Sequence, residues 1–530
     1  MSKQPAPGLR RLRWLLLVLA AIGCGLPRNV VRPPSSALVD TRHTTLGELT
    51  APATAKHPGE SGFLLFNTGE GAIQARVAMA ELAQSSIDAM YFQWGRDTVG
   101  RVLLDRMIAA ADRGVRVPLL IDDYWASGYD LSFETIAAHP NMEVRVFNPF
   151  VRGRMRVTQL LGRFTELNRR MHNKLFVADG QLAVVGGRNL IDDYFGLGKE
   201  ICYRDFDLLA MGPVVSQAEA AFDQYWNSQW AYPISSLVKP PSQAEADREL
   251  HRFSERVAAD RANFPYALPH DRDTALAFLV QFRGKGIWGP AELVYDDPNS
   301  VTNPAEAPPG RVWKKVNELA MQAQHEIVLE NPYLLPQPKM PTVRALRERG
   351  VQLRMLTNSL GTADEVPLNA HYAKARPEMV DLGVELYEVK PYAASRALYI
   401  ARPATSKARL GAARKGHGVR PQDGGHRIVQ PRSALEEPRH RNGLHRAEPT
   451  AGGAGSRRLR PRLRARERLA HRRRRRRGRR RLDHREPRAA ARRAARSGQR
   501  VAALPPVNRA APAHCLVALR NRLTCPREKC

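Results

Sequence analysis

The sequence predicts an α/β protein of two similar halves, each with a mixed sheet flanked by helices, in which the second half is truncated. Three observations support this fold class. Short apolar strands alternate with amphipathic helices from Gly62 onward, the same alternation begins again after about residue 290, and apolar periodicity is lost after Leu410. Strands that alternate with helices are typical of a largely parallel or mixed sheet with helices on both faces.

Four segments of the first half carry this pattern. Apolar periodicity predicts a strand at Ser86–Phe92, an amphipathic helix at Thr98–Arg113, and further strands at Val115–Asp122 and Met142–Phe147. The Val115–Asp122 strand is apolar on both faces and is therefore expected to lie inside the sheet.

The second half repeats the order of the first. A charged stretch at 233–290, with its clearest helix at Gln243–Arg261, is interpreted as a helical connecting arm between them. The elements predicted beyond it are helix Arg311–Gln324, strand Glu326–Glu330, helix Met340–Arg349, strand Val351–Leu356 and a segment Gly383–Tyr392 that echoes Asn141–Phe150. Two similar halves predict a pseudo-twofold enzyme with a site at the interface between them.

The predicted organisation has six parts. They are a lipoprotein-type signal (1–24), a linker (25–61), the first half (62–232), the arm (233–290), the second half (291–410) and a basic tail (411–530). The tail holds 35 Lys and Arg against 8 Asp and Glu, a net charge of +27 that leaves only +4 for the first 410 residues. Because proteins that bind a phosphate backbone usually carry a basic stripe, the nearly neutral main part argues against a nucleic-acid partner.

The N-terminus has the pattern of a secretory signal that ends in a lipid attachment site. Arg10, Arg11 and Arg13 precede an apolar run at Trp14–Ile22, and Gly-Cys follows at Cys24. The run is too short to span a bilayer, which needs roughly 20 apolar residues. We predict a lipid on Cys24, with an uncleaved amphipathic anchor as the alternative; either places the protein at a membrane surface of the cell envelope.

The five cysteines predict neither a disulfide framework nor a zinc site. They stand at positions 24, 202, 515, 525 and 530, with no Cys-x-x-Cys pair and no His/Cys cluster at ligand spacing. We therefore expect no metal and no cofactor.

One motif at the end of the first half contains the candidate catalytic residues. It comprises His172, Lys174, Asp179, Gly186, Gly187, Arg188 and Asn189, and it is followed by an acidic strand beginning at Arg204. Residues two apart on a strand project from the same face, so the imidazole and the ammonium converge. Phosphodiester cleavage needs a nucleophile that can leave again and fixed donors for the non-bridging oxygens, and this set supplies both.

The motif and the sequence segments around it resemble the HKD superfamily, which includes phospholipase D, cardiolipin synthases, phosphatidylserine synthases and certain nucleases. The segments AADRGVRVPLLIDD (110–123), VVGGRNLIDDYF (184–195), RDFDLLAMGPVV (204–215) and VYDDP (294–298) are similar to bacterial cardiolipin-synthase-type members, and the similarity covers roughly 32–410. The resemblance implies a mechanism through a covalent phosphohistidine, with a second histidine that protonates the leaving alcohol. Which of the two histidines is the nucleophile stays open.

The resemblance also implies roles for the other motif residues. Lys174 and Asn189 would bind phosphate oxygens, with Gly186 and Gly187 beside them in the substrate site. A carboxylate on the next strand would orient the His172 ring; Asp205 is favoured and Asp207 is the alternative. Asp179 of the motif is expected to close the turn after the strand rather than to carry protons.

The family pattern requires a second HxKxxxxD, and the chain contains none. Spacing from the first half places the second histidine near residue 414. Read one base later, the codons there can encode the motif at the junctions Ala413–Arg414 (His), Lys415–Gly416 (Lys) and Arg420–Pro421 (Asp). We therefore predict that Gly411–Cys530 is largely an out-of-frame translation that forms a disordered tail, and that its Arg block at His471–Arg481 does not bind nucleic acid.

The sequence thus predicts phosphatidyl transfer or hydrolysis on a phospholipid at a membrane surface, with a glycerol-type lipid or water as acceptor. A nucleic-acid phosphodiesterase is the enzyme alternative. The other alternative is an inactive half-site protein, which could regain a second histidine only by pairing two first-half motifs in a homodimer.

Overall fold

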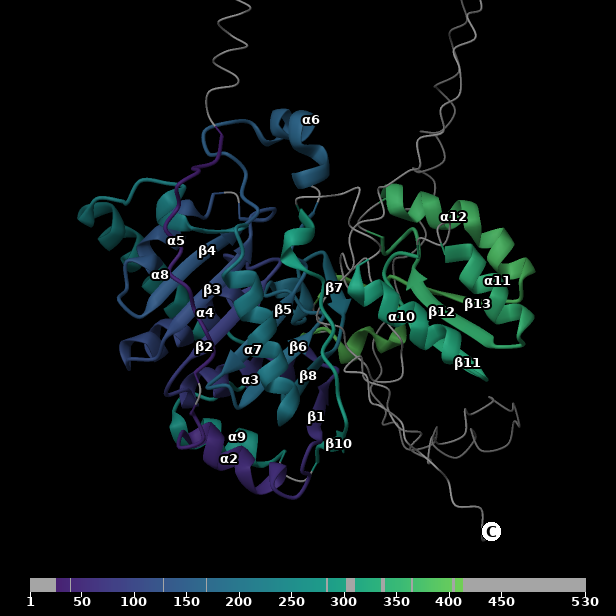
Figure 1. Cartoon of the computed structure of the whole chain (residues 1–530), viewed down its shortest axis with the longest axis horizontal. Coiled ribbons are helices and arrows are strands. Elements are labelled where there is room, and N and C mark those ends of the chain that lie inside the picture. The colour runs from purple at the N-terminus through teal and green to yellow at the C-terminus, as the bar shows by residue number, and fades with distance from the viewer. Residues whose placement is uncertain are drawn as a thin grey trace, which may run out of the picture. The chain divides into compact units, whose positions relative to one another are not determined.

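The computed structural model describes residues 25–412, except 39, 127, 168, 283–284, 302–309, 335–338, 364–365 and 403–405 (Figure 1). Cys24 and the tail from residue 413, with its Arg block, lie outside the described residues. None of the helices in the described part is both long and apolar enough to cross a bilayer.

The first half contains a mixed nine-stranded sheet in the order β10-β1-β8-β6-β5-β2-β3-β4-β9. Its strands are β1 (Ser61–Phe66), β2 (Ile87–Tyr91), β3 (Val117–Asp122), β4 (Met142–Phe147), β5 (Lys174–Ala178), β6 (Leu182–Gly186), β8 (Asp207–Met211), β9 (Ala231–Pro233) and β10 (Ile287–Gly289). The pairs β2–β3 and β3–β4 are parallel, and all other pairs are antiparallel.

Both faces of this sheet are buried, and alternate side chains of one strand enter different cores. Ile87 and Ala89 of β2 belong to one hydrophobic cluster and Met90 to another. The first cluster includes α3 (Gly69–Leu82), α4 (Thr98–Asp112) and α9 (Arg272–Val280), and the second includes α7 (Pro213–Trp226). Helices on both faces explain why the central strands are apolar throughout.

The predicted linker and arm both contribute to the first half. The linker contains α2 (Thr45–Thr54), and the arm contains α8 (Gln243–Ala262) beside α9. Helix α8 contacts α4 and α5 (Asp130–Ala137), α9 contacts α3, and β10 adds an edge strand to β1. The helix predicted at 243–261 is thus present and packs against the first half.

The second half has the element order that the repeat predicts. Its elements are α10 (Arg311–Gln322), β11 (Glu326–Glu330), α11 (Met340–Glu348), β12 (Gln352–Asn358), α12 (Val366–Asp381) and β13 (Glu385–Val389). The three strands are parallel in the order β11-β12-β13, as β2-β3-β4 are in the first half. In the first half β5 continues the sheet beyond β2, whereas among the described residues β11 pairs only with β12.

A two-stranded sheet joins the halves. Strand β14 (Arg409–Ala412) pairs in parallel with β7 (Ile201–Arg204), and the Ala412 backbone N–H donates to Asn358 Oδ1 at 2.8 Å. The described second half therefore continues two residues past the predicted boundary at 410. The remaining helices are α6 (Arg156–Leu167) and the short 3-10 helices at 192–194, 234–236, 298–301 and 394–398.

Candidate active site

The motif is built on the β5–β6 hairpin, in the middle of the first sheet. Asp179, Gly180 and Gln181 connect the two strands; Asp179 and Gly180 have φ values of +51° and +60°, and the Gln181 backbone N–H donates to the Ala178 carbonyl oxygen at 3.0 Å. Positive φ at both central positions is what a type I′ hairpin turn requires, and Asp-Gly is a preferred pair for it. The hairpin therefore fixes the register of β5, and with it the positions of the residues that enter the strand at its other end.

His172 and Lys174 are in direct contact at the start of β5. Lys174 Nζ lies 3.0 Å from His172 Nδ1 and 3.1 Å from Nε2, and it donates to the His172 carbonyl oxygen at 3.0 Å. The Lys174 side chain is buried, whereas His172 is partly exposed. Because an ammonium has donors only, the ring nitrogen that faces it presents a lone pair. The imidazole and the ammonium thus lie together on one face of the strand, and a nucleophilic role for the ring stays a prediction.

An aromatic wall bounds the imidazole. The Phe92 ring centroid lies 4.6 Å from that of His172, and Lys174 Nζ lies 5.5 Å from the Phe92 centroid. Tyr124 stacks on Phe92 at 6.3 Å and keeps 38% of its surface exposed. Apolar rings beside the motif lower the local polarity and thereby strengthen the charge interactions of the ammonium.

Asp122 holds the chain segment that leads into the motif. Its carboxylate accepts the Met171 backbone N–H at 2.8 Å and pairs with the Arg170 guanidinium at 2.8 Å. Burial raises the pKa of Asp122 to about 6, although the Arg170 charge and the backbone N–H donors act in the opposite direction. A carboxylate at the end of β3 thus fixes the backbone immediately before His172.

The neighbouring Asp123 organises a basic loop. Its carboxylate accepts hydrogen bonds from both terminal nitrogens of Arg152, at 2.7 and 2.9 Å, and from the Phe150 backbone N–H at 2.7 Å. Arg156 donates to the carbonyl oxygens of Asp123 and Tyr124 and stacks over the Phe150 ring at 4.5 Å. The segment that carries His172 therefore has three arginines held near it: Arg152, Arg156 and Arg170.

A pocket beside His172 includes residues from the start of the second half. It contains about 340 Å³ of open space, and His172, Arg169, Asp296, Asp297 and Ser300 are among its lining residues. Arg169 donates to the Ser300 carbonyl oxygen at 2.5 Å, and the Asp296 carboxylate accepts the Val312 backbone N–H. The VYDDP segment therefore lies next to the motif.

Asp179 has a structural position. Its carboxylate accepts the backbone N–H groups of Gln84, Ser85 and Ser86 at 2.7 to 3.1 Å. It stands seven residues beyond His172 along an extended segment, which corresponds to roughly 20 Å. The acid of the motif thus ties the β5–β6 turn to the start of β2, in agreement with the expected turn-closing role.

Gly186 and Gly187 lie where β6 approaches β8. A Cβ on Gly186 would meet Asp207 Oδ1 and would lie 2.6 Å from the Phe206 carbonyl oxygen. The Gly187 backbone N–H donates to the same carbonyl at 3.0 Å. Packing against Asp207 explains the residue type at Gly186, and a contact of either glycine with substrate remains a prediction.

The two candidate acids for orienting the imidazole differ in their surroundings. Asp207 is fully buried, with Oδ2 2.9 Å from Arg76 and 3.7 Å from Arg188. Burial lowers the pKa of Arg76, but the charge of Asp207 together with Tyr91 and the hydrogen bonds to both outweighs burial, so the net shift of this pKa is upward. Asp207 is thus committed to a buried ion pair in the core. The orienting role stays a prediction for Asp205, which is buried just before β8 and accepts the Phe206 backbone N–H at 2.7 Å.

Asn189 is buried just beyond β6. Its Nδ2 donates to the Tyr194 hydroxyl at 3.2 Å, whereas Oδ1 has no hydrogen-bond partner among the described residues. A buried polar atom without a partner is costly and is often a place where a ligand binds. The amide is therefore a candidate for contact with a bound group.

Four residues around the motif were not identified from the sequence: Phe92, Asp122, Tyr124 and Arg170. Phe92, Asp122 and Tyr124 lie at the end of a strand or in the loop after it, and Arg170 lies in the segment between α6 and β5. Asp122 and Asp123 at the end of the apolar strand could have indicated the site from the sequence, since ionisable residues at the end of a buried strand often belong to a functional site.

Comparison with known proteins identifies the family. Residues 77–226 match the family described as "Cardiolipin synthase, PLD-like domain". Cardiolipin synthase C of Escherichia coli (strain K12) is 34% identical over 349 residues, which cover 65% of this chain and 73% of that protein. An uncharacterized protein of Helicobacter pylori (strain ATCC 700392 / 26695) is 28% identical over 378 residues, 69% of this chain and 73% of its own. The solved phosphatidylserine synthase of Haemophilus influenzae Rd KW20 aligns with 72% of this chain and 85% of its own at 13% identity and a TM-score of 0.43.

The match to 73% of a relative at 34% identity covers far more than the motif. It is more than twice as long as the family match at 77–226. The chain therefore belongs to the cardiolipin synthase family of phospholipase D-like phosphatidyltransferases and phosphodiesterases.

Proposed function

We propose that the protein transfers the phosphatidyl group of a phospholipid through a covalent phosphohistidine in which His172 takes part. The observation that carries the proposal is the contact of Lys174 Nζ with the His172 ring at 3.0 Å, next to an open pocket. In the first step a histidine nitrogen forms a bond to phosphorus, and the bond from phosphorus to the departing head-group oxygen breaks. The second histidine gives that oxygen its proton.

In the second step the acceptor hydroxyl attacks the phosphohistidine, the phosphorus–nitrogen bond breaks, and the acceptor proton passes to the second histidine. A glycerol-bearing lipid as acceptor gives a cardiolipin-type product, and water gives hydrolysis. Both outcomes use the same intermediate, so the acceptor decides between transferase and hydrolase activity.

We assign the remaining polar groups by the chemistry that each can supply. The Lys174 ammonium would bind a non-bridging oxygen as charge develops there. A rotation of the Asn189 amide by 180° would let Oδ1 accept from the Tyr194 hydroxyl and would turn Nδ2 to the position that now has no partner. A phosphate oxygen needs such a donor. Asp205 would hold the His172 ring through its second nitrogen.

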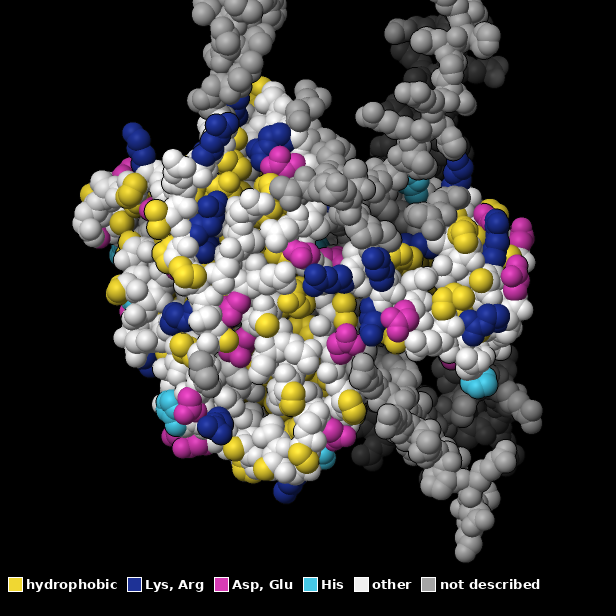
Figure 2. Space-filling view, viewed as in Figure 1, with side chains coloured by type: hydrophobic (Ala, Val, Ile, Leu, Met, Phe, Trp, Pro, Cys, Tyr) yellow, Lys and Arg dark blue, Asp and Glu magenta, His cyan; other side chains and the backbone are white. Residues whose placement is uncertain are grey.

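The membrane supplies the substrate in this proposal. A lipid attached to Cys24 would hold the enzyme at the surface of the cell envelope, where phospholipid is locally concentrated. Figure 2 supports a lipid rather than a nucleic-acid substrate, because acidic and basic side chains are interspersed over the face that it shows.

The second histidine must come from outside the present reading frame. Sheet β11-β12-β13 is the counterpart of β2-β3-β4, and β11 has no described neighbour where β5 stands in the first half. Read one base later, the codons after β13 can encode the required motif at the distance that the first half predicts. We therefore propose that the written chain is a half-site and that a frame-corrected chain is the active enzyme.

The test is turnover of phosphatidylglycerol vesicles by frame-corrected variants. His172→Ala should lower the rate by at least about 10²-fold, since it removes the nucleophile or the acid. Lys174→Arg should also be severe, because a guanidinium fork does not replace a point cation in a tight phosphate site. His251→Ala is the control, since it removes a solvent-exposed imidazole from α8 and should leave turnover unchanged. Full activity of the His172→Ala enzyme would overturn the assignment.

A further inference from the structure

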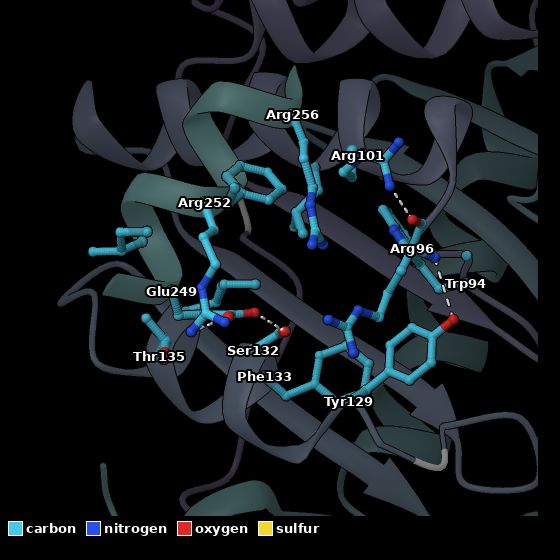
Figure 3. Close-up of a pocket in the computed structure, with 15 residues that line it drawn as sticks. Trp94, Arg96, Arg101, Tyr129, Ser132, Phe133, Thr135, Glu249, Arg252 and Arg256 are labelled. Atoms are coloured by element: carbon cyan, nitrogen blue, oxygen red, sulfur yellow. Dashed lines mark hydrogen bonds and ion pairs between the residues drawn. The ribbon is translucent and has the colours of Figure 1, made fainter. Parts of the chain in front are cut away.

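A second pocket lies between α4, α5 and α8 and shares no lining residue with the pocket beside His172. It is a partly open groove, and its roughly 630 Å³ of open space includes the solvent at its mouth. Its apolar walls are formed by Trp94, Leu104, Phe133, Ile136, Leu250 and Phe253 (Figure 3). Leu250 keeps 45% of its surface exposed, so the apolar wall continues to the outside.

Arginines surround this apolar space. Arg96, Arg101, Arg252 and Arg256 all line the pocket, and Figure 3 shows the side chains of Arg96 and Arg256 directed into it. Arg101 is paired with Asp260 at 2.6 Å, and Arg252 lies 3.5 Å from Glu249.

Two of the four guanidinium groups are not neutralised in this way. Arg96 donates to the Gly128 carbonyl oxygen at 2.8 Å and lies over the Tyr129 ring at 5.4 Å. Arg256 is exposed on α8 and has no carboxylate within ion-pair distance among the described residues. The pocket therefore combines an apolar interior with an excess of positive charge.

An amphiphile with an apolar tail and an anionic head complements such a site. Guanidinium groups bind phosphate oxygens in a planar, two-pronged geometry, and they are preferred over lysine for this purpose. We propose that this pocket binds one anionic phospholipid of the membrane, with an acyl chain between α4, α5 and α8 and the phosphate at Arg96 and Arg256. The lipid acts as an anchor and is not turned over there.

The pocket is linked to the motif through the chain. Trp94 forms a β-bridge with Leu190, and the Gly95 backbone N–H donates to the Leu190 carbonyl oxygen at 2.7 Å. Leu190 follows Asn189, and Phe92, two residues before Trp94, contacts the His172 ring. A lipid held against Trp94 would therefore anchor the segment that carries the aromatic wall. This inference assumes the lipid surface of the proposed function but none of its catalytic steps.

The test is photo-crosslinking of the full chain with phosphatidylglycerol that carries a diazirine in one acyl chain, followed by peptide mapping. Mapping is needed because the basic tail would draw any protein variant to anionic vesicles. We expect labels on peptides that contain Leu104, Ile136 or Phe253. The same probe with a phosphatidylcholine head group should label these peptides at least about tenfold less, because it carries no net negative charge.

Three variants on α8 test whether labelling depends on residues of the pocket or on the charge of the helix as a whole. Arg256→Glu and Leu250→Glu should each lower pocket labelling about tenfold, since each places a carboxylate at the mouth. Arg248→Glu changes the same charge at an exposed position outside the pocket and should leave labelling as in wild type. All three positions are exposed, so the fold should be kept, which circular dichroism checks.

His172→Ala distinguishes this inference from the proposed function. Pocket labelling that persists in the frame-corrected His172→Ala chain, while turnover falls relative to the frame-corrected wild type, supports an anchoring site separate from catalysis. Absence of label in the pocket peptides, equal labelling by both head groups, or labelling that Arg256→Glu leaves unchanged would overturn the inference.

Discussion

The spacing of two residues between His172 and Lys174 has a direct structural consequence. The ammonium lies near both ring nitrogens and donates to the backbone carbonyl of the same histidine, so the lysine holds the imidazole in place. Asp122 fixes the preceding residue from the other side through the Met171 N–H. The position of the reacting ring therefore depends on two charged groups, one inside the motif and one outside it.

Asp122 predicts a pH dependence of turnover. Burial raises the pKa of this carboxyl to about 6, so it is ionised at pH 8 and gains a proton as the pH falls through 6. Protonation removes the charge that pairs with Arg170 and loosens the backbone before His172. We expect the rate of the frame-corrected enzyme to fall below about pH 6, and Asp122→Asn to be slow already at pH 8 and to lack this inflection.

The measurement is the rate of head-group release between pH 5 and 9 for both enzymes. Circular dichroism at each pH shows that the fold persists. If the Asp122→Asn enzyme has the same pH dependence of head-group release as the wild type, Asp122 does not position His172.

At the residue scale, the motif was predictable and its surroundings were not. His172, Lys174 and the structural role of Asp179 follow from spacing along one strand and one turn. The ion pair of Asp207 could not be predicted, because only packing shows that Arg76, more than 130 residues earlier in the chain, lies beside it; the orienting role of Asp205 stays a prediction. Phe92 and Tyr124 were missed because an aromatic residue at a strand end gives no local signal of what it faces.

At the element scale, the close approach of β6 and β8 supports the hairpin that carries the motif. These strands pair from Leu182–Met211 to Gly186–Asp207, and Asp207 continues into the buried ion pair with Arg76. Gly186 is the position where the strands leave no room for a side chain.

Gly186→Ala should therefore destabilise the first half. Overpacking of this kind costs about 1–3 kcal/mol in the free energy of unfolding. The measurement is the midpoint of urea unfolding followed by tryptophan fluorescence. Gly286→Ala is the matched control, since the nearest atom to its added Cβ lies at an ordinary contact distance of 3.4 Å. Equal midpoints for the two variants would show that β6 can move away from β8 without cost.

Most central strands and long helices could be predicted from hydrophobic periodicity, and strand Met142–Phe147 has the predicted bounds. Short edge strands could not be predicted. Strands β9 and β10 have three residues each, too few for a periodic pattern. The arm was recognised as helical, but a helical pattern does not reveal which surface the helix covers, so its packing on α3, α4 and α5 came from the structure.

At the scale of the whole molecule, the two halves are joined by backbone pairing and by charge. Strand β14 pairs with β7, and Arg204 forms an ion pair with Glu330 of β11 at 3.0 Å. The repeat itself was predictable from element order, since three strands and their helices recur. The strand pairing between the halves was not, because β14 has only four residues, too few for a periodic pattern.

The lipid anchor is a prediction about the mature protein. Labelling of growing cells with a radioactive fatty acid should mark the wild-type protein and miss Cys24→Ala, because only a thiol at this position can accept the lipid. The labelled protein should sediment with membranes. Cys202→Ala is the control, since that thiol is buried and its loss should not change labelling. Equal labelling of wild type and Cys24→Ala would leave the uncleaved anchor as the alternative.

The central claim is that this chain holds one half of a two-histidine site. Express the written sequence and a version shifted by one base near codon 413, and assay both for head-group release from phosphatidylglycerol vesicles. The shifted chain should be faster by at least about 10²-fold, because it regains the general acid together with the second lysine and asparagine. It should also be more soluble, since β11 would regain a neighbouring strand. A written chain that is as active and as soluble as the shifted one would contradict the account.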